Sequence, residues 1–291
     1  MKSRSLFLAF SFAMGGLAFA QTNSSNYTPP KTAWGDPDLQ GVYTTDDLNG
    51  VPMERPKEYG TRRFLTEQEY AARSQEVKSE RSTINTGIRP TTGFWALVKN
   101  GGVDAAAAPA QWIEYAKDAS RLTSLIVDPP DGRIPALTPE GQKRRASQPQ
   151  YYNMRPASYL DLSSYDRCIT RGVTGSFFPS IYGNGSQILQ APGVVAIRYE
   201  MIHETRLIPL DGRPHDSSGL RSYMGDPRGH WEGNTLVVET TNFIGGKVDV
   251  GGVPYSEDLK LTERFTRVAP NIIDYKVTHW RPAISPTNSS E

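Results

Sequence analysis

The sequence predicts a mainly β protein with a few helices, in which an antiparallel meander forms a barrel or a strongly curved sheet, wrapped by a loop-and-helix N-terminal half. The second half of the chain contains six consecutive strand-like segments with turn residues between them. No helical crossover separates these segments, which favours antiparallel neighbours. The first half is interrupted by Pro and Gly, so it offers few continuous apolar faces. Such a sheet must close on itself or stack on a second layer to bury its apolar side.

The N-terminus has the pattern of an export signal. Residues 1–20 begin with basic side chains, continue through the apolar run of residues 6–19, and end in the small residues Ala18 and Ala20, which are typical of a cleavage site. The apolar run is too short to span a bilayer comfortably. We therefore expect a mature protein that starts at Gln21 and is periplasmic or secreted.

The rest of the chain suits a single β-rich domain, residues 34–291, because about 270 residues are enough for one large core. Residues 21–33 are polar and proline-bearing, which predicts a flexible lead-in. Within the domain we expect the loop-and-helix wrap over residues 34–160, the antiparallel sheet over 161–280 and a polar tail over 281–291.

Charge and motif content exclude several function classes. The formal net charge is +1, so the chain has no electrostatic signature of nucleic-acid binding, and no later segment is long and apolar enough to predict a membrane span. The sequence contains no phosphate loop, dinucleotide fingerprint, HExxH or CxxC motif, so no cofactor is predicted. The expected partner is a small molecule, and the oligomeric state is left open.

The clearest helix of the first half is predicted over Glu67–Glu80. Thr66 and Glu69 have the spacing of a capping box, in which each side chain accepts a hydrogen bond from the other residue's backbone N–H. The other elements predicted for this half are a strand at Gly41–Thr44, a helix entered through Pro109, a short strand at Ser124–Asp128 and a helix at Pro139–Ala146.

The second half contains the predicted sheet. Gly233 and Asn234 supply a hairpin turn, since both tolerate positive φ, and the β-branched run after them favours a strand. The predicted strands are Gly193–Glu200, Thr205–Leu210, Gly229–Trp231, Thr235–Phe243, Leu259–Val268 and Ile272–His279.

Ionisable residues interrupt the apolar face of several of these strands. Counted by alternation, His203 falls on the face of Tyr199 and Leu207, with Arg206 on the other face. Glu239 falls on the face of Val237 and Phe243, and Glu263 and His279 fall on apolar faces of the last two strands. Alternation fails if a bulge or turn shifts the register.

These ionisable residues have three interpretations. Each can be paired with an arginine or hydroxyl inside the sheet, which is a structural role. Alternatively His203, Glu239 and Glu263 form a ligand pocket or an acid–base catalytic site, because burial and charged neighbours shift the pKa values of such groups. A metal site is the third reading, but the spacing is not diagnostic and no metal is predicted.

Candidate ligand-binding residues lie on the strands and in the loop between them. Loops on a rigid sheet often carry specificity, and arginine there can bind a carboxylate or phosphate. The alternative for the loop residues is local salt bridges within turns. The candidates are Tyr199, Arg206, Arg213, His215, Arg228, Trp231 and Phe265.

Cys168 is the only cysteine, so no internal disulfide can form. An unpaired cysteine in an exported protein is usually a small buried hydrophobe, which is the reading we expect here. The alternative is a reactive thiol whose pKa is lowered by Arg167 and Arg171.

Long motifs carry a resemblance to a known group of proteins. The segments DRCITRG, EMIHETRLIPLDGRPH and GHWEGNTLVVETTNF resemble a family of exported bacterial proteins, over nearly all of the mature chain. The resemblance implies no established activity. It implies that relatives continue past the last strand into a segment with a second cysteine, so that the partner of Cys168 would lie there.

The sequence therefore favours an exported protein that binds a small, apolar or aromatic molecule in a β-sheet pocket. An acid–base enzyme, a lyase, isomerase or hydrolase that uses His203 with Glu239 or Glu263, is the first alternative. An envelope interaction module without a small-molecule site is the second. Whether the protein is an enzyme is left open.

Overall fold

The computed structural model describes residues 27–84, 114–146, 157–180, 182–217, 219–245 and 257–280. The predicted export signal and the polar tail lie outside these described residues, as does the start of the helix entered through Pro109. Residues 114–120, the described end of that predicted helix, are not helical, so this part of the prediction was wrong.

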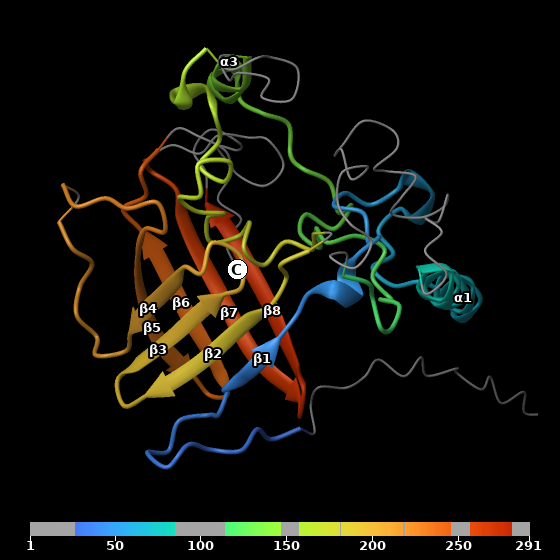
Figure 1. Cartoon of the computed structure of the whole chain (residues 1–291), viewed down its shortest axis with the longest axis horizontal. Helices are drawn as coiled ribbons and strands as arrows, with labels where there is room; N and C mark the ends of the chain where they lie inside the picture. Colours follow the sequence, from blue (N-terminus) through green and yellow to red (C-terminus); the bar gives the residue numbers. More distant parts are fainter. Residues whose placement is uncertain are drawn as a thin grey trace, which may run out of the picture.

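The described chain is mainly β and forms two antiparallel four-stranded sheets (Figure 1). The first sheet contains β1 (Gly41–Tyr43), β2 (Ser186–Ala191), β3 (Val194–Tyr199) and β4 (Thr205–Pro209). The second sheet contains β5 (Asp226–Glu232), β6 (Thr235–Thr241), β7 (Lys260–Ala269) and β8 (Ile272–Trp280). Neighbours within each sheet follow in chain order, which confirms the predicted antiparallel order of the strands.

The two sheets are separate ladders rather than one closed sheet. Among the described residues no ladder joins β4 to β5 or β8 to β1. β4 nevertheless passes close to β5 at Gly229, where an added Cβ would lie 2.6 Å from a methyl of Leu210 and 2.8 Å from one of Ile208. A residue with a side chain at position 229 would therefore have to displace the Leu210 and Ile208 side chains.

Few helices accompany the sheets. α1 (Glu67–Ile84) and α3 (Pro139–Ala146) are α-helical, and η2 (Asp46–Leu48), η3 (Lys57–Tyr59) and η7 (Tyr159–Asp161) are single 3₁₀ turns. The capping box of α1 is confirmed: Glu69 N donates to Thr66 Oγ1 at 3.3 Å, and Thr66 N donates to Glu69 Oε2 at 2.7 Å. α1 stands to one side of the sheets in Figure 1. None of the described helices combines the length and apolar character that crossing a bilayer requires.

Two sequence predictions about strands were wrong. Residues 124–128 form no strand, because their backbone bonds go to an irregular segment: Leu125 N donates to Pro52 O and Ile126 N to Met53 O. β2 was not predicted, since its sequence SQILQA contains only a short apolar run between polar residues. Cross-strand partners on both sides, β1 and β3, make this segment a strand.

The core lies between the two sheets. Alternation along each strand sends one set of side chains inward, as in β7, where Leu261, Glu263 and Phe265 are buried and Arg264 is exposed. The buried apolar residues that form the core are Leu39, Val173, Ile188, Val195, Ile197, Tyr199, Ile208, Met224, Leu236, Val238, Phe243, Leu259, Leu261 and Phe265. Both sheets, together with Leu39 of the front half, therefore contribute to one core.

A buried asparagine ties the front half to the sheets. Asn184 Nδ2 donates to Asp46 Oδ1 at 2.9 Å, and Asn184 N donates to Glu114 Oε2 at 3.1 Å. Burial, and next to it the charge of Asp46, raises the pKa of the Glu114 carboxyl. Polar contacts thus attach this part of the front half beside the start of β2.

Candidate functional site

The most unusual feature of the core is an ion pair between its two sheets. Arg206 of β4 and Glu263 of β7 lie with Nη2 2.5 Å from Oε2, and their side chains are 1% and 0% exposed. Arg206 Nη2 also donates to Thr240 Oγ1 at 2.5 Å, and Tyr275 Oη donates to Glu263 Oε1 at 3.1 Å. Charged groups are rarely buried without a partner, so the pair explains how both sit in the core.

Arg206 reaches the core because the turn before β4 changes the alternation. Ile202 and His203 both have positive φ, 63° and 59°, and they reverse the chain between β3 and β4. Arg206 then lies opposite Ile197 on the inner face of the sheet. The sequence prediction that counted straight through this turn was wrong: Arg206 points inward, while Leu207 is 62% exposed.

Several polar atoms at this site have no hydrogen-bond partner in the described part of the chain. They are buried, and they include Arg206 Nε and Nη1 and Tyr199 Oη. Glu263 Oε2 meets Arg206 as an ion pair but without hydrogen-bond geometry. A buried donor without an acceptor costs roughly 1–3 kcal/mol, so several of them at one place call for an explanation.

The electrostatic state of the site follows from burial. Burial raises the pKa of Tyr199, and the same effect raises that of Tyr275, so both phenols are neutral at physiological pH. Burial by itself would lower the pKa of Arg206, but the Glu263 carboxylate, together with Tyr199 and Tyr275, more than offsets this effect, so the pKa is raised. The site therefore contains one cation, one anion, two neutral phenols and the Thr240 hydroxyl.

Aromatic rings pack against one another in the same region of the core. Phe177, from the segment that precedes β2, packs with its ring centroid 5.3 Å from that of Tyr199, 5.8 Å from that of Phe265 and 4.6 Å from that of Tyr275. Trp231, Leu236, Phe265 and Tyr275 are cross-strand partners in one row across the second sheet. Of these residues, Tyr199, Trp231 and Phe265 were predicted from the sequence as ligand-binding residues, and alternation placed Tyr275 on the inner face.

The predicted catalytic set does not come together. Glu263 is buried as predicted, but His203 is exposed in the turn before β4. Glu239 is also exposed, because Leu236, Val238 and Thr240 are the residues of β6 that face the core. The predictions that His203 and Glu239 lie on buried faces were therefore wrong, and the three side chains share no site.

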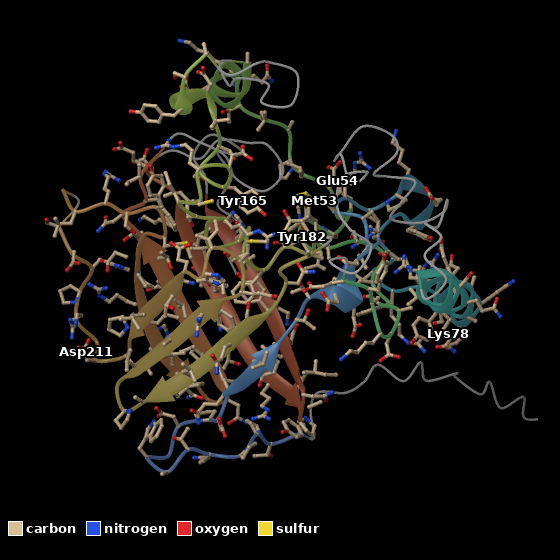
Figure 2. All side chains as sticks on the ribbon, in the orientation of Figure 1. Met53, Glu54, Lys78, Tyr165, Tyr182 and Asp211 are labelled. Atoms are coloured by element: carbon tan, nitrogen blue, oxygen red, sulfur yellow. The ribbon has the colours of Figure 1, made fainter. Side chains whose placement is uncertain are left out.

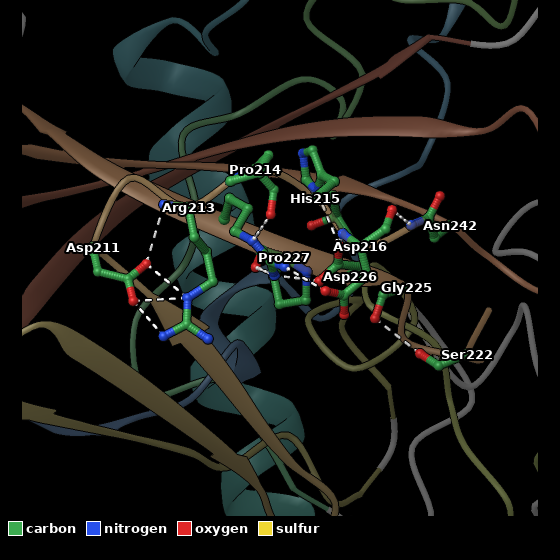
Figure 3. Close-up of polar contacts among 12 residues, drawn as sticks. Asp211, Arg213, Pro214, His215, Asp216, Ser222, Gly225, Asp226, Pro227 and Asn242 are labelled. Carbon is green, nitrogen blue, oxygen red and sulfur yellow. Dashed lines mark hydrogen bonds and ion pairs between the residues drawn. The ribbon is translucent and has the colours of Figure 1, made fainter. Parts of the chain in front are cut away.

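The loop candidates form a separate cluster at the surface, around the start of β5 (Figure 3). His215 Nδ1 lies 3.2 Å from Asp226 Oδ2, and Asp216 N donates to the same oxygen at 2.7 Å. Arg228 donates to Pro214 O at 3.0 Å and also contacts Asp226. Every nitrogen of the Arg228 guanidinium meets a protein oxygen, so this arginine clamps the loop to β5.

Arg213 and Asp211 pair within the same loop. Arg213 Nε donates to Asp211 Oδ2 at 2.7 Å, and Asp211 Oδ1 also accepts from the Arg213 backbone N at 3.2 Å (Figure 3). The two side chains are 60% and 41% exposed. This arrangement matches the reading of Asp-Gly-Arg as a turn with a local salt bridge.

Cys168 lies in a tight turn on the surface. It is exposed and has a positive φ of 54°, so the expectation of a buried cysteine was wrong. The neighbouring guanidiniums are engaged elsewhere: Arg167 lies over the ring of Tyr159, and Arg171 Nη1 donates to Gly183 O at 2.9 Å.

A tyrosine pair lies next to this turn. Tyr165 Oη and Tyr182 Oη are 3.0 Å apart, and Figure 2 labels both residues beside the upper end of the sheets. Burial, followed by the hydrogen bond to Tyr182, raises the pKa of Tyr165 to about 12.

The described residues offer no metal centre: no three His, Cys, Asp or Glu side chains among them come together in a way that could hold a metal ion. Comparison of the chain with protein-family models, curated proteins and solved structures finds no match. The function must therefore be inferred from the geometry of the chain itself.

Proposed function

We propose that this protein binds a small aromatic molecule between its two sheets, against Arg206, Tyr199 and Glu263. The observation that supports this proposal is the group of buried donors without protein acceptors, Arg206 Nε and Nη1 and Tyr199 Oη. Folded proteins leave few buried polar groups unsatisfied, because each one costs stability. A bound molecule with an acceptor would satisfy these donors, and the rings around them suit an apolar or aromatic body.

The surroundings of Arg206 support this proposal in two further ways. The pair is held by elements of both sheets, β4 and β7, so the groups are positioned by rigid strands rather than by loops. The close approach of β4 to β5 at Gly229 brings the sheets together along one edge. We further propose that the sheets act as the two halves of an open, barrel-like enclosure around the site.

A test must separate binding from folding, because removal of one partner of a buried ion pair destabilises the protein. The double variant Arg206→Met/Glu263→Leu replaces both charges by apolar side chains of similar size, and such replacements are often neutral for stability. Benzamide, phenol and benzoate are titrated into the wild type and the double variant. We expect saturable binding of at least one probe to the wild type and its loss in the folded double variant. Equal behaviour of the two proteins would refute the proposal.

Acid–base catalysis is a second candidate, and one observation favours it. The His215–Asp226 contact at 3.2 Å is the arrangement in which a carboxylate orients an imidazole. His203 and Glu239 do not provide this arrangement. If His215 acts as an acid or base, His215→Gln abolishes turnover of a substrate found by screening while His230→Gln leaves it unchanged. Equal activity of both variants would remove His215 from consideration.

The interaction-module alternative depends on the outer face of the first sheet. Leu189, Ala196 and Leu207 are cross-strand partners in one row, and both leucines are exposed. Exposed apolar residues can mark a binding surface, but single ones are common on ordinary proteins. Leu189→Ser/Leu207→Ser should abolish association with envelope components if this row is the interface.

We also propose a periplasmic or secreted location, from the signal-like sequence of residues 1–20. Sequencing the N-terminus of exported material should show Gln21 first. Retention of Met1 on the exported protein would contradict this location.

A further inference from the structure

The groups around Arg206 are balanced in charge. Arg206 carries one positive charge and Glu263 one negative charge, and the two side chains are buried against each other. Tyr199 and Tyr275 remain neutral because burial raises both of their pKa values. An added anion would therefore meet a cation that is already neutralised, and it would lie near the Glu263 carboxylate. In a buried site such an excess charge is costly.

The same groups are unbalanced in hydrogen bonding. Arg206 Nε, Arg206 Nη1 and Tyr199 Oη are donors without an acceptor, and Glu263 Oε2 is an acceptor without a hydrogen bond of good geometry. A matching molecule must offer an acceptor to the donors and a donor to the carboxylate. A primary amide offers both from adjacent atoms, because its carbonyl oxygen accepts and its NH₂ group donates.

The rings beside these groups indicate the rest of the molecule. Phe177, Phe265 and Tyr275 pack in tilted or edge-on contacts with centroids 4.6–5.8 Å apart. Phe177 is only partly buried and comes from the segment before β2 rather than from either sheet. A flat ring can enter such a cluster with favourable edge or offset contacts.

We propose that the ligand is an uncharged aromatic molecule with an amide-like group, whose oxygen accepts from Arg206 and Tyr199 and whose N–H donates to Glu263. This inference rests on the proposed function and specifies its ligand class. It predicts that the site discriminates against aromatic carboxylates of the same size and shape.

Benzamide and benzoate test the inference, because they differ mainly in charge and in the NH₂ donor. Both are titrated into the full-length mature protein at pH 7.5, and binding is followed by ligand-observed NMR. We expect benzamide to bind at least about tenfold more tightly than benzoate, because one unmatched hydrogen-bonding group changes affinity by about this factor. Benzoate that binds as tightly as benzamide would overturn the inference.

Two tyrosine variants test the geometry. Tyr199→Phe removes a hydroxyl that interacts with the Arg206 guanidinium but makes no hydrogen bond of good geometry, so it should fold normally and bind benzamide roughly threefold to tenfold more weakly. Tyr275→Phe removes a hydroxyl that already donates to Glu263, so benzamide affinity should change less. An unchanged affinity in Tyr199→Phe would contradict the assigned contact.

The outcomes separate this inference from the proposed function. In one outcome, phenol or benzoate binds to the wild type but not to Arg206→Met/Glu263→Leu, and benzamide binds no more tightly than they do. This outcome would support the binding site and refute the amide ligand class. If none of the probes binds, ordered water satisfies the buried donors, and both proposals fail.

Discussion

Arg206 and Arg213 each form an ion pair with a carboxylate, but Arg206 is buried between two sheets and Arg213 lies in a surface loop. Arg213 and Asp211 are two residues apart in sequence, so the turn itself brings them together. Arg206 and Glu263 are far apart in sequence and come from different sheets. The same chemical pair is thus a local consequence of a turn in one region and a product of the whole fold in the other.

Burial decides what each pair contributes. In solvent, water screens the charges, and the gain from pairing is about 0–1 kcal/mol. Between the sheets neither charge can be solvated, so loss of one partner leaves the other buried and uncompensated. A short contact distance by itself therefore says little about how much an ion pair contributes to the free energy of unfolding.

Arg206→Met should lower the free energy of unfolding by about 3–5 kcal/mol, because it leaves the Glu263 carboxylate buried without its cation. Adding Glu263→Leu to this variant should restore most of the loss. Urea unfolding of the two single variants and the double variant gives the coupling energy. Single losses that simply add in the double variant would show that the two charges act independently.

Arg228→Met should destabilise the protein by roughly 1.5–3 kcal/mol, because this side chain is 15% exposed and bonds the loop to Asp226 and Pro214. Hydrogen exchange at the Asp216 amide, which donates to Asp226, should become faster. Unchanged exchange there would mean that Arg228 does not hold the loop.

His279 of β8 is a largely buried side chain whose pKa is changed by burial, so it tests how burial affects the stability of the protein at different pH values. Burial lowers its pKa to about 4, against about 6.5 in the unfolded chain. The neutral form is therefore favoured by folding, and this contribution to stability is full above pH 6.5 and is lost as the pH falls towards 4. At pH 5 the loss should reach up to about 2 kcal/mol, with a smaller value expected because the side chain keeps some solvent contact.

The His279→Gln variant isolates this contribution. The difference in unfolding free energy between pH 7 and pH 5 should be smaller in this variant than in the wild type. His230→Gln is the matched control, since His230 is 53% exposed in the same sheet. An identical pH dependence in wild type and His279→Gln would exclude a buried neutral imidazole.

Arg213→Met should change stability least of these variants, because its ion pair lies in solvent. Thermal unfolding at low and high salt checks this, and both conditions should give nearly the same small difference. A loss comparable with that of Arg228→Met would show that exposure does not separate the two arginines.

Much of the strand order could be predicted from the sequence. The hairpin of β5 and β6 follows from Gly233 and Asn234, and α1 begins at its capping box because Thr66 and Glu69 have the required spacing. Alternation also placed Glu263 and Tyr275 on inner faces, because both strands stay in register over these residues. These features depend on interactions within a few residues along the chain.

Alternation failed where the chain turned. The two positive-φ residues Ile202 and His203 separate β3 from β4. The prediction continued the alternation of side chains from β3 through these residues, and so it exchanged the inner and outer faces of β4. Phe177 gave no signal, because its segment has no regular period. The role of a side chain beyond a turn therefore depends on a backbone conformation that periodicity does not encode.

The sequence by itself determined the mainly β class, the antiparallel order of the strands and the local caps, because turn geometry and side-chain alternation operate over neighbouring residues. The division into two sheets and the meeting of Arg206 with Glu263 were decided by the tertiary structure. So was the choice of which carboxylates are buried: Glu263 lies in the core, and Glu239, on the neighbouring strand, faces solvent. These outcomes depend on how two separate ladders pack face to face, and the energy of a charge depends on what that packing places around it.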